Sequence, residues 1–457
     1  MSTIHSQRAR EVLKDYDDVS RHDQTFWSIR TFRDIMAGML PEWESLRNHA
    51  SDIKRHVITH LADYLEEFSN QLESRGVVVH WAKNAQELNE IVYGILVTNQ
   101  VDKLVKSKSM LTEECGLNDY LSKRDIDVVE TDLGERILQL MGKAPAHIVV
   151  PAVHIKREDV GKMFEAKGIS KEVGNYDPTY LTYCARKNLR NEFLEAQACL
   201  TGCNFGVAKT GDMVVCTNEG NADMATSIPK LHIVTMGIEK LVPDYESLAV
   251  FQRLLCRCGT GQPTTTFTSH FRQARPGGKM HVVLLDNGRS DILANEQHWQ
   301  TLKCIRCGAC MNTCPVYRRS TGPSYTYFIP GPIGINLGML ADPVKYSDNV
   351  SACTLCLSCD KVCPVELEPG SQIYYWRQEL DALGKSDQMK KVMSKGMSLL
   401  YNNPELYTTA LKFAPLANYV PEALTRSRKL NPWGIGHAMP KFARQSFHEW
   451  WKSQNKK

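Results

Sequence analysis

The sequence predicts an α/β protein in which a mixed, mainly parallel sheet precedes a helical two-cluster ferredoxin-type domain and a helical extension. Short apolar strands alternate with amphipathic helices over about residues 71–290, which is typical of a parallel sheet covered on both faces. Two cysteine runs of equal spacing follow, and then helical periodicity broken by prolines. We therefore expect four parts: a helical segment (1–70), the α/β domain (71–290), the cluster domain (291–370) and the extension (371–457).

The α/β domain is expected to begin after an amphipathic helix. Ile53, Val57, Leu61, Leu65 and Phe68 recur at helical spacing, which predicts a helix over residues 52–72. Gly76 ends this helix, and the apolar run after it predicts a buried strand. The elements expected next are strands at 77–81, 102–106, 126–130 and 147–150, and helices at 84–96 (with Asn84 as N-cap), 110–121 and 133–141.

The second half of the domain adds further strands. The turn Thr210-Gly211-Asp212 predicts a hairpin, so part of the sheet is expected to be antiparallel. Asp286-Asn287-Gly288 is a turn signal near the end of the domain. The strands are expected at 204–209, 213–217, 231–236, 264–268 and 281–285.

The two cysteine runs both read C-x2-C-x2-C-x3-C-P, the bacterial pattern for 4Fe–4S clusters. In two-cluster proteins the last cysteine of each run binds the cluster of the other run. The duplication suggests an electron relay, since one cluster would be enough to stabilise the fold. We therefore expect two 4Fe–4S clusters, one held by Cys304, Cys307, Cys310 and Cys363 and the other by Cys353, Cys356, Cys359 and Cys314.

Zinc and disulfide sites are the main alternatives for these cysteines. Zinc ribbons usually carry two C-x2-C pairs, not two triplets that each end in Cys-Pro. A disulfide framework is disfavoured in a chain of 457 residues whose first ten residues lack an apolar signal core. A purely structural role for the clusters stays open. The seven remaining cysteines match no cluster or zinc spacing.

Composition excludes some classes of protein and leaves the location partly open. A net charge of +4 gives no case for nucleic-acid binding, and no run of 18 apolar residues predicts a membrane span. Fifteen cysteines without a signal segment suggest the reducing cytoplasm. The tail, with Trp433, Trp450, Trp451, Lys456 and Lys457, hints at peripheral attachment to the inner membrane face or at docking, and equally fits a packed helix with a frayed end.

Three polar segments beside predicted strands are candidate ligand contacts. Lys106, Lys108 and Ser109 follow one strand, where α/β folds place ligands and where lysines could bind a carboxylate or phosphate. Glu219 lies in a polar turn (217–221) and could act as an acid or base. Thr201 is expected in a loop before a strand. The alternative for each is a solvated turn or a helix cap, and no G-x-G-x-x-G or Walker A motif is present.

Several phrases resemble the lactate utilization protein B family. They include Cys304-Ile305-Arg306-Cys307-Gly308-Ala309-Cys310, Pro330-Gly331-Pro332-Ile333-Gly334, Lys106-Ser107-Lys108-Ser109-Met110 and the C-terminal Trp433-Gly434. The resemblance covers nearly the whole chain. It implies an α/β domain related to sugar-phosphate isomerase and CoA-transferase-like folds, and membership of a three-component complex that oxidises L-lactate to pyruvate.

These observations favour an electron-transfer subunit that works with companion subunits and an unidentified acceptor. On this view the chain is a component of an oxidoreductase rather than a complete enzyme, and its catalytic residues are unknown. The alternative is a substrate-binding or catalytic subunit of a related, glycolate-type oxidase. A non-redox module with structural clusters is the third hypothesis.

Overall fold

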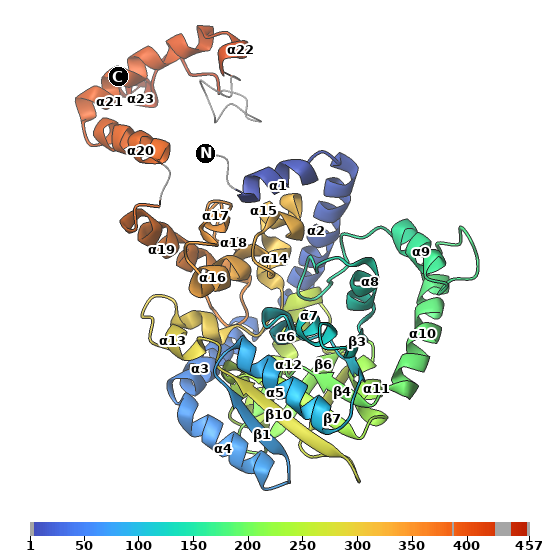
Figure 1. Ribbon diagram of the computed structural model, residues 1–457. Helices are drawn as coiled ribbons and strands as arrows, with labels where there is room; N and C mark the ends of the chain where they lie inside the picture. The colour runs from blue at the N-terminus through green and yellow to red at the C-terminus, as the bar shows by residue number, and fades with distance from the viewer. Residues whose placement is uncertain (1–3, 386–387, 426–439, 455–457) are drawn as a thin grey trace. The chain divides into compact units, whose positions relative to one another are not determined.

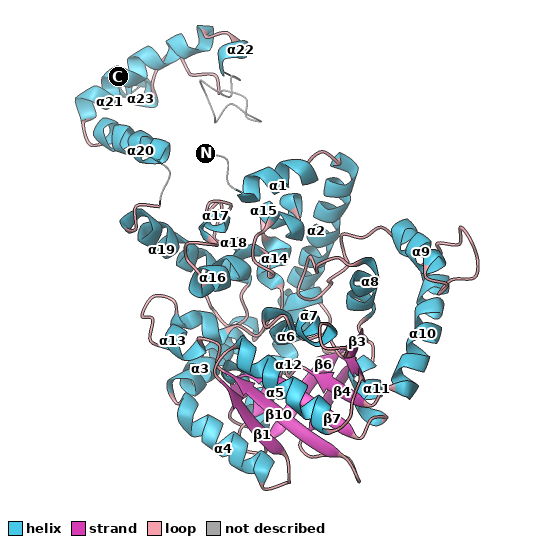
Figure 2. Cartoon of the chain, viewed as in Figure 1, coloured by secondary structure: helices cyan, strands magenta, loops and turns pink. Residues whose placement is uncertain are grey.

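The chain forms two compact units, one ending at Leu380 and one beginning at Asp381, in a computed structural model that describes residues 4–385, 388–425 and 440–454. Both sheets and both cysteine runs belong to the first unit. Figure 1 follows the chain from blue to red, and Figure 2 shows the strands of this unit with helices packed around them.

A six-stranded sheet organises the first unit, and all of its paired strands are parallel. The mainly parallel sheet predicted from the sequence is thereby confirmed. Its edge strand β1 pairs with β10, which follows it by about 200 residues, so the sheet is complete only when the whole domain is present. In sheet order the strands are β1 (Val78–Ala82), β10 (Lys279–Leu285), β7 (Leu231–Gly237), β4 (Ala198–Thr201), β2 (Lys103–Lys106) and β3 (Asp127–Glu130).

The antiparallel strand pairs belong to a second, mixed sheet, in which β5 and β8 are parallel. The predicted hairpin is present, because β5 pairs antiparallel with β6 across the turn at Gly211. It belongs to a four-stranded sheet and not to the six-stranded one, so that part of the expectation was wrong. The order is β8 (Leu241–Val242), β5 (Phe205–Val207), β6 (Asp212–Thr217) and β9 (Phe267–Phe271).

Alternating side chains of the parallel strands enter two different cores, as a sheet buried on both faces requires. In β10, Val283 and Leu285 pack with Leu88 and Val92 of α5 (Ala85–Thr98) on one face. Met280, Val282 and Leu284 pack on the other face in a core that includes α3 (Trp43–Thr59) and α4 (Leu61–Glu73). This second core continues through Met311 and Tyr317 into the cluster region, so sheet and cluster region share one apolar interior.

Several predicted helices are present with altered bounds. Asn84 caps α5 as expected, since its side chain accepts a hydrogen bond from the Glu87 N–H. The predicted helix over 52–72 is divided at His60, and the one over 110–121 is divided at Gly116, which adopts a left-handed φ of 62°. The other helices before the cysteine runs are α1 (Ile4–Val12), α2 (Tyr16–Gly38), α6 (Met110–Glu114), α7 (Leu117–Ser122), α8 (Leu133–Met141), α9 (Arg157–Ala166), α10 (Pro178–Glu195), α11 (Asn221–Ser227), η1 (Ile238–Lys240), α12 (Tyr245–Thr260) and α13 (Arg289–Leu293).

The cysteine region is built from short helices. Each run places its third cysteine on a five-residue helix and its fourth directly after that helix. The helices are η2 (Trp299–Lys303), α14 (Ala309–Thr313), α15 (Pro315–Ser320), η3 (Gly322–Ser324), α16 (Gly331–Ala341), α17 (Ser347–Val350), α18 (Ser358–Val362) and α19 (Pro369–Ala382).

Some strand predictions were wrong. Residues 147–150 form a loop, and β4 was missed, so Thr201 ends a strand instead of preceding one. The strand at 77–81 was expected to be buried, but β1 is an edge strand in which Val78 and Trp81 are 47% and 50% exposed. The strand expected at 264–268 begins later, at Phe267.

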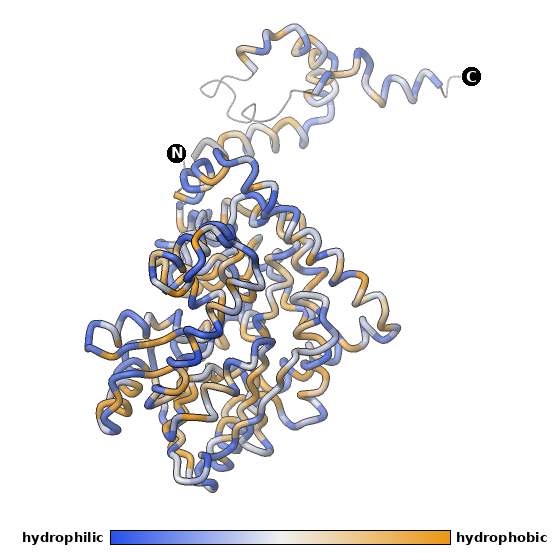
Figure 3. The backbone as a smooth tube through the Cα atoms, turned by 90° about the vertical axis from the view of Figure 1, so that its right-hand side faces the viewer, coloured by the Kyte–Doolittle hydropathy of each residue, from blue (hydrophilic) through white to orange (hydrophobic). Residues whose placement is uncertain are grey.

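The second unit is helical over the residues described. Its helices are α20 (Gln388–Tyr401), α21 (Pro404–Phe413), η4 (Ala414–Tyr419), α22 (Glu422–Thr425) and α23 (Phe447–Gln454), and Figure 3 shows apolar and polar stretches mixed along the chain. Asn403 caps α21, and Pro404 occupies its first position. Trp450 and Trp451 lie on α23, while Trp433, Gly434, Lys456 and Lys457 lie outside the described residues. Within the described ranges, no helix is both long and apolar enough to cross a membrane.

Candidate functional site

The two cysteine loops have the same backbone conformation. Arg306 and Leu355, each two residues after the first cysteine of its run, have left-handed φ values of 60° and 54°. Their N–H groups donate to the Sγ atoms of Cys304 (3.4 Å) and Cys353 (3.3 Å). Since left-handed φ is unfavourable for these side chains, the loops must be held in place by their surroundings. Such curled loops with N–H groups aimed at sulfur suit a sulfur-bound cluster.

The last cysteine of each run accepts a backbone hydrogen bond in a similar way. Tyr317 N–H points to Cys314 Sγ at 3.5 Å, and Leu367 N–H points to Cys363 Sγ at 3.3 Å. Cys314 is also the N-cap of α15, followed by Pro315 at the first helical position.

The fold brings the last cysteine of each run close to the other run. Cys363 interacts electrostatically with Cys304, Cys307 and Cys310 of the first run. Cys314 in turn interacts with Cys353, Cys356 and Cys359 of the second run. Each group contains the four sulfur donors that a 4Fe–4S cluster requires.

Within the described ranges, no three His, Cys, Asp or Glu side chains converge closely enough to ligate one metal ion. A cubane instead takes one thiolate at each of four iron atoms, so its donors stand farther apart.

Burial controls the protonation of these thiols. Burial raises the pKa of Cys314 and of Cys363 to about 11, although hydrogen bonds from backbone N–H groups lower it in part. Burial raises the pKa of Cys307 and Cys310 further. The metal-free thiols are therefore protonated at neutral pH, and metal binding must displace those protons. Cys356 is exposed, whereas Cys359 and Cys363 are buried.

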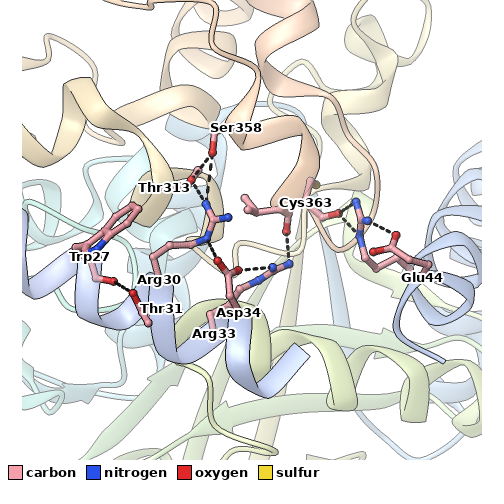
Figure 4. A network of polar contacts seen from close by, with 11 residues as sticks. Trp27, Arg30, Thr31, Arg33, Asp34, Glu44, Thr313, Ser358 and Cys363 are labelled. Atoms are coloured by element: carbon pink, nitrogen blue, oxygen red, sulfur yellow. Dashed lines mark hydrogen bonds and ion pairs between the residues drawn. The ribbon is translucent and has the colours of Figure 1, made fainter. Parts of the chain in front are cut away.

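Three arginines of the N-terminal helices hold the cysteine helices (Figure 4). Arg30 on α2 donates to Thr313 and, at 3.4 Å, to Ser358, which joins α14 to α18. Arg33 donates to the Val362 carbonyl at 3.2 Å. Arg47 on α3 donates twice to the Cys363 carbonyl, from Nε at 3.0 Å and from Nη2 at 2.9 Å. The sequence contained no local sign of these contacts.

A cavity of about 380 Å³ lies at the carboxyl ends of the parallel strands and reaches the first cysteine loop. Of the residues predicted from sequence, Lys108, Ser109 and Glu219 line it. Lys108 Nζ donates to the Val149 carbonyl at 2.8 Å. Burial and the neighbouring Asp132 raise the pKa of Glu219, whose carboxylate accepts from the Leu133 N–H at 3.0 Å.

Lys106 and Thr201 have other surroundings. Lys106 is buried, and its Nζ lies 2.5 Å from Glu130 Oε1 and 3.4 Å from Glu113 Oε1. Although burial opposes the charged form, these carboxylates raise the pKa of Lys106. Thr201 is also buried, with Oγ1 2.9 Å from Nε2 of His232. Both side chains therefore serve internal contacts of the sheet.

His147, in the loop that was expected to be a strand, links the cavity wall to the first run. Its Nδ1 accepts from the N–H groups of Val149 (3.0 Å) and Val150 (3.1 Å), so Nε2 carries the proton and donates to Asn312 Oδ1 at 3.0 Å. Asn312 then donates to the Gly259 carbonyl at 2.7 Å. Burial lowers the pKa of His147 to about 3, which keeps the ring neutral.

A buried arginine bridges two carboxylates beside the same loop. Arg289 Nε lies 2.6 Å from Glu239, and its Nη2 lies 3.0 Å from Glu114. Burial opposes ionisation of Glu239, but Arg289 and Lys240 lower its pKa to about 2. Arg289, Glu114, Glu239 and Arg306 also line a second cavity of about 690 Å³ that reaches Cys304. The sequence interpretation missed Arg289, Glu114 and Glu239, which lie far apart along the chain.

Three protein families match consecutive parts of the chain. The LUD domain matches residues 65–289, the 4Fe-4S dicluster domain matches 300–367, and the C-terminal domain of lactate utilisation protein B matches 381–456.

Curated relatives match over nearly the whole length. Lactate utilization protein B of an Exiguobacterium species is 38% identical over 427 residues, covering 92% of this chain and 90% of the relative. Lactate utilization protein B of Lysinibacillus sphaericus is 36% identical over 478 residues, covering 100% and 98%. A solved DUF162 family protein from Deinococcus radiodurans is 13% identical and covers 49% of this chain and 98% of its own, with a TM-score of 0.28.

Proposed function

The chain belongs to the lactate utilization protein B family, and from this premise we propose that it is the electron-transfer subunit of a cytoplasmic complex that oxidises L-lactate to pyruvate. It has a role in lactate utilisation and carries two 4Fe–4S clusters. When bound, such clusters supply one-electron transfer. Companion subunits and an electron acceptor of unidentified nature would complete the complex.

The electrostatic interaction of each run's last cysteine with the other run is the observation that carries this proposal. We propose that one cluster is held by Cys304, Cys307, Cys310 and Cys363, and the other by Cys353, Cys356, Cys359 and Cys314. The electrostatic interactions between the runs support these sets, because each fourth cysteine acts on cysteines of the other run. Two sites built from interlocked loops are suited to passing electrons between them.

The surroundings of the two runs support a direction for the relay. Cys307 lines the cavity at the sheet edge, whereas Cys356 of the second run is exposed. We propose that electrons enter at the first run and leave at the second, toward a partner. Arg30, Arg33 and Arg47 hold the intervening helices, which keeps the two loops at a constant separation.

A substrate-binding or catalytic role in a related glycolate-type oxidase is the second candidate, and the cavity beside the first loop favours it. We also propose a sugar-phosphate isomerase or CoA-transferase-like fold for residues 71–290. Six parallel strands with helices on both faces support that assignment.

Metal analysis and electron paramagnetic resonance test the relay. Protein purified without oxygen should contain about eight iron and eight sulfide ions per chain. Replacing Cys310→Ala should remove about half of the iron and abolish electron transfer from lactate in the complex assembled with its companion subunits. Cys115→Ala, at a buried thiol outside both runs, is the matched control and should keep both clusters. A metal-free wild type, or full electron transfer in the Cys310 variant, would contradict the proposal.

A further inference from the structure

The cavity at the carboxyl ends of the parallel strands has two different walls. One wall contains Ser107, Gly202 and Thr235, from the carboxyl ends of β2, β4 and β7, where open α/β sheets bind their ligands. The other wall contains Ile305, Arg306 and Cys307 of the first cysteine loop. A molecule in this cavity would touch the sheet and the loop together.

Four cations line the cavity, and three of them are already paired. Lys108 lies 3.7 Å from Asp132, Lys240 lies 3.8 Å from Glu239, and Arg289 bridges Glu114 and Glu239. The fourth is Arg306, whose Nη1 is buried from solvent and has no hydrogen-bond partner among the described residues. Arg306 as a whole is half-buried, but a buried donor without an acceptor is costly, so this one N–H group is available to a ligand.

The second cysteine loop shows that this charge is not needed to form the loop. Leu355 occupies the position equivalent to Arg306, with nearly the same φ (54° against 60°) and the same N–H contact to a cysteine sulfur. An uncharged side chain therefore supports the same conformation. The guanidinium of Arg306 is therefore free to act on its surroundings, and it helps to lower the pKa of Glu114 and of Glu239.

Two hydroxyl groups in the cavity also lack partners. Ser107 is 2% exposed and follows β2 directly, and its Oγ has no hydrogen-bond partner in the described part of the chain. The same holds for Thr217 Oγ1 at the end of β6. Buried hydroxyls are normally hydrogen-bonded. Arg306, Ser107 and Thr217 together offer one guanidinium group and two hydroxyl groups to a polar ligand.

The lining contains as many acids as cations. Four acids (Glu114, Asp132, Glu219 and Glu239) face the four cations. Burial and Asp132 raise the pKa of Glu219.

We propose that this cavity binds a small carboxylate of the hydroxy- or oxo-acid class, with two to four carbons, and that Arg306 pairs with its carboxylate while Ser107 and Thr217 contact its oxygen on the neighbouring carbon. A planar guanidinium matches a carboxylate with two parallel hydrogen bonds. The acid class rests on the proposed role in lactate oxidation, whereas the anion site rests on the contacts themselves. The site brings a ligand to the loop that contains Cys307.

Calorimetric titration of the cluster-containing, full-length chain without oxygen tests the proposal, with L-lactate, pyruvate and inorganic phosphate as probes. Wild type should bind at least one of the two acids more tightly than phosphate. Arg306→Leu, which installs the residue of the second loop, should weaken acid binding by roughly 10- to 100-fold. Arg190→Leu, on the exposed side of α10, should leave the binding constant unchanged.

Iron content and electron paramagnetic resonance of each variant show whether the clusters remain. Thr217 lies outside the cysteine loops, so Thr217→Val should weaken acid binding several-fold with both clusters intact. This variant tests acid binding in the cavity even if Arg306→Leu loses iron. Clusters that take up and release electrons in a protein that binds neither acid would overturn this inference and leave the relay standing. Unchanged acid binding in Arg306→Leu, or equal binding of phosphate, would overturn it as well.

Discussion

Arg47 provides a direct test of how the N-terminal helices hold the cysteine region. Its guanidinium is buried, with 9% of the side chain exposed, and donates two hydrogen bonds to the Cys363 carbonyl. Arg47→Met keeps an unbranched apolar stem but leaves that carbonyl without these donors. A hydrogen bond from a charged group contributes about 1.5–3 kcal/mol, and an unsatisfied buried acceptor costs about 1–3 kcal/mol. We therefore expect a loss of about 2–4 kcal/mol in the stability of the first unit.

The matched control separates these hydrogen bonds from the ion pair that Arg47 also makes. Glu44 lies 2.5 Å from Arg47, but its side chain is 71% exposed, so the pair should contribute at most about 1 kcal/mol. Glu44→Gln should therefore shift unfolding only slightly. Guanidinium unfolding without oxygen, followed by the visible absorbance of the clusters, measures both variants. Equal shifts for the two would refute the reasoning, as would a normal midpoint for Arg47→Met.

Two further predictions concern buried titratable groups. Burial and the charge of Glu130 raise the pKa of Glu135 from 4.5 to about 8, so its stabilising contribution is complete below pH 4.5 and is lost as the pH rises through 8. Glu135→Gln should therefore raise the melting temperature relative to wild type at pH 9. The matching gain in the free energy of unfolding has an upper limit of about 5 kcal/mol, at about 1.4 kcal/mol per tenfold change in the acid constant. The difference should shrink toward pH 5, and the exposed Glu73→Gln should show no such trend. His147→Phe removes the two hydrogen bonds that the ring accepts and the one that it donates, so it should lower the free energy of unfolding by about 2–4 kcal/mol. It should also speed the bleaching of the clusters in air, whereas the exposed His448→Phe should not. Bleaching at the wild-type rate would contradict the role given to this ring.

Local patterns in the sequence were enough for the parallel sheet and the cysteine runs. The cysteine spacing and the alternation of strands with helices each extend over a few consecutive residues, so they can be recognised without the fold. The segment 147–150 was misread because Ile148, Val149 and Val150 form a short apolar run, which periodicity alone cannot assign. Strand β4 was missed since Ala198, Cys199 and Leu200 are not β-branched.

Side-chain partners were harder to predict than elements. Lys106 follows the pattern of a ligand residue at a strand end, yet the register places it directly across from Glu130 on the neighbouring strand. The two sit at corresponding ends of parallel strands, which is the signal that could have paired them. The contact between Arg47 and Cys363 joins residues 316 positions apart and has no local trace.

Gly259 explains why the cysteine region and the sheet behave as one body. A Cβ atom on this residue of α12 would lie 2.8 Å from the Cys307 carbonyl, so only glycine lets the helix approach the first loop so closely. The Gly259 carbonyl meanwhile accepts from Asn312, which His147 holds in place. The first loop is thereby positioned by a helix and a loop of the α/β domain, while the equivalent second loop has an exposed cysteine. An independent ferredoxin module joined by a linker would not need these contacts. The cavity and the first run share a wall because α12 and the loop of His147 in the α/β domain pack against that run.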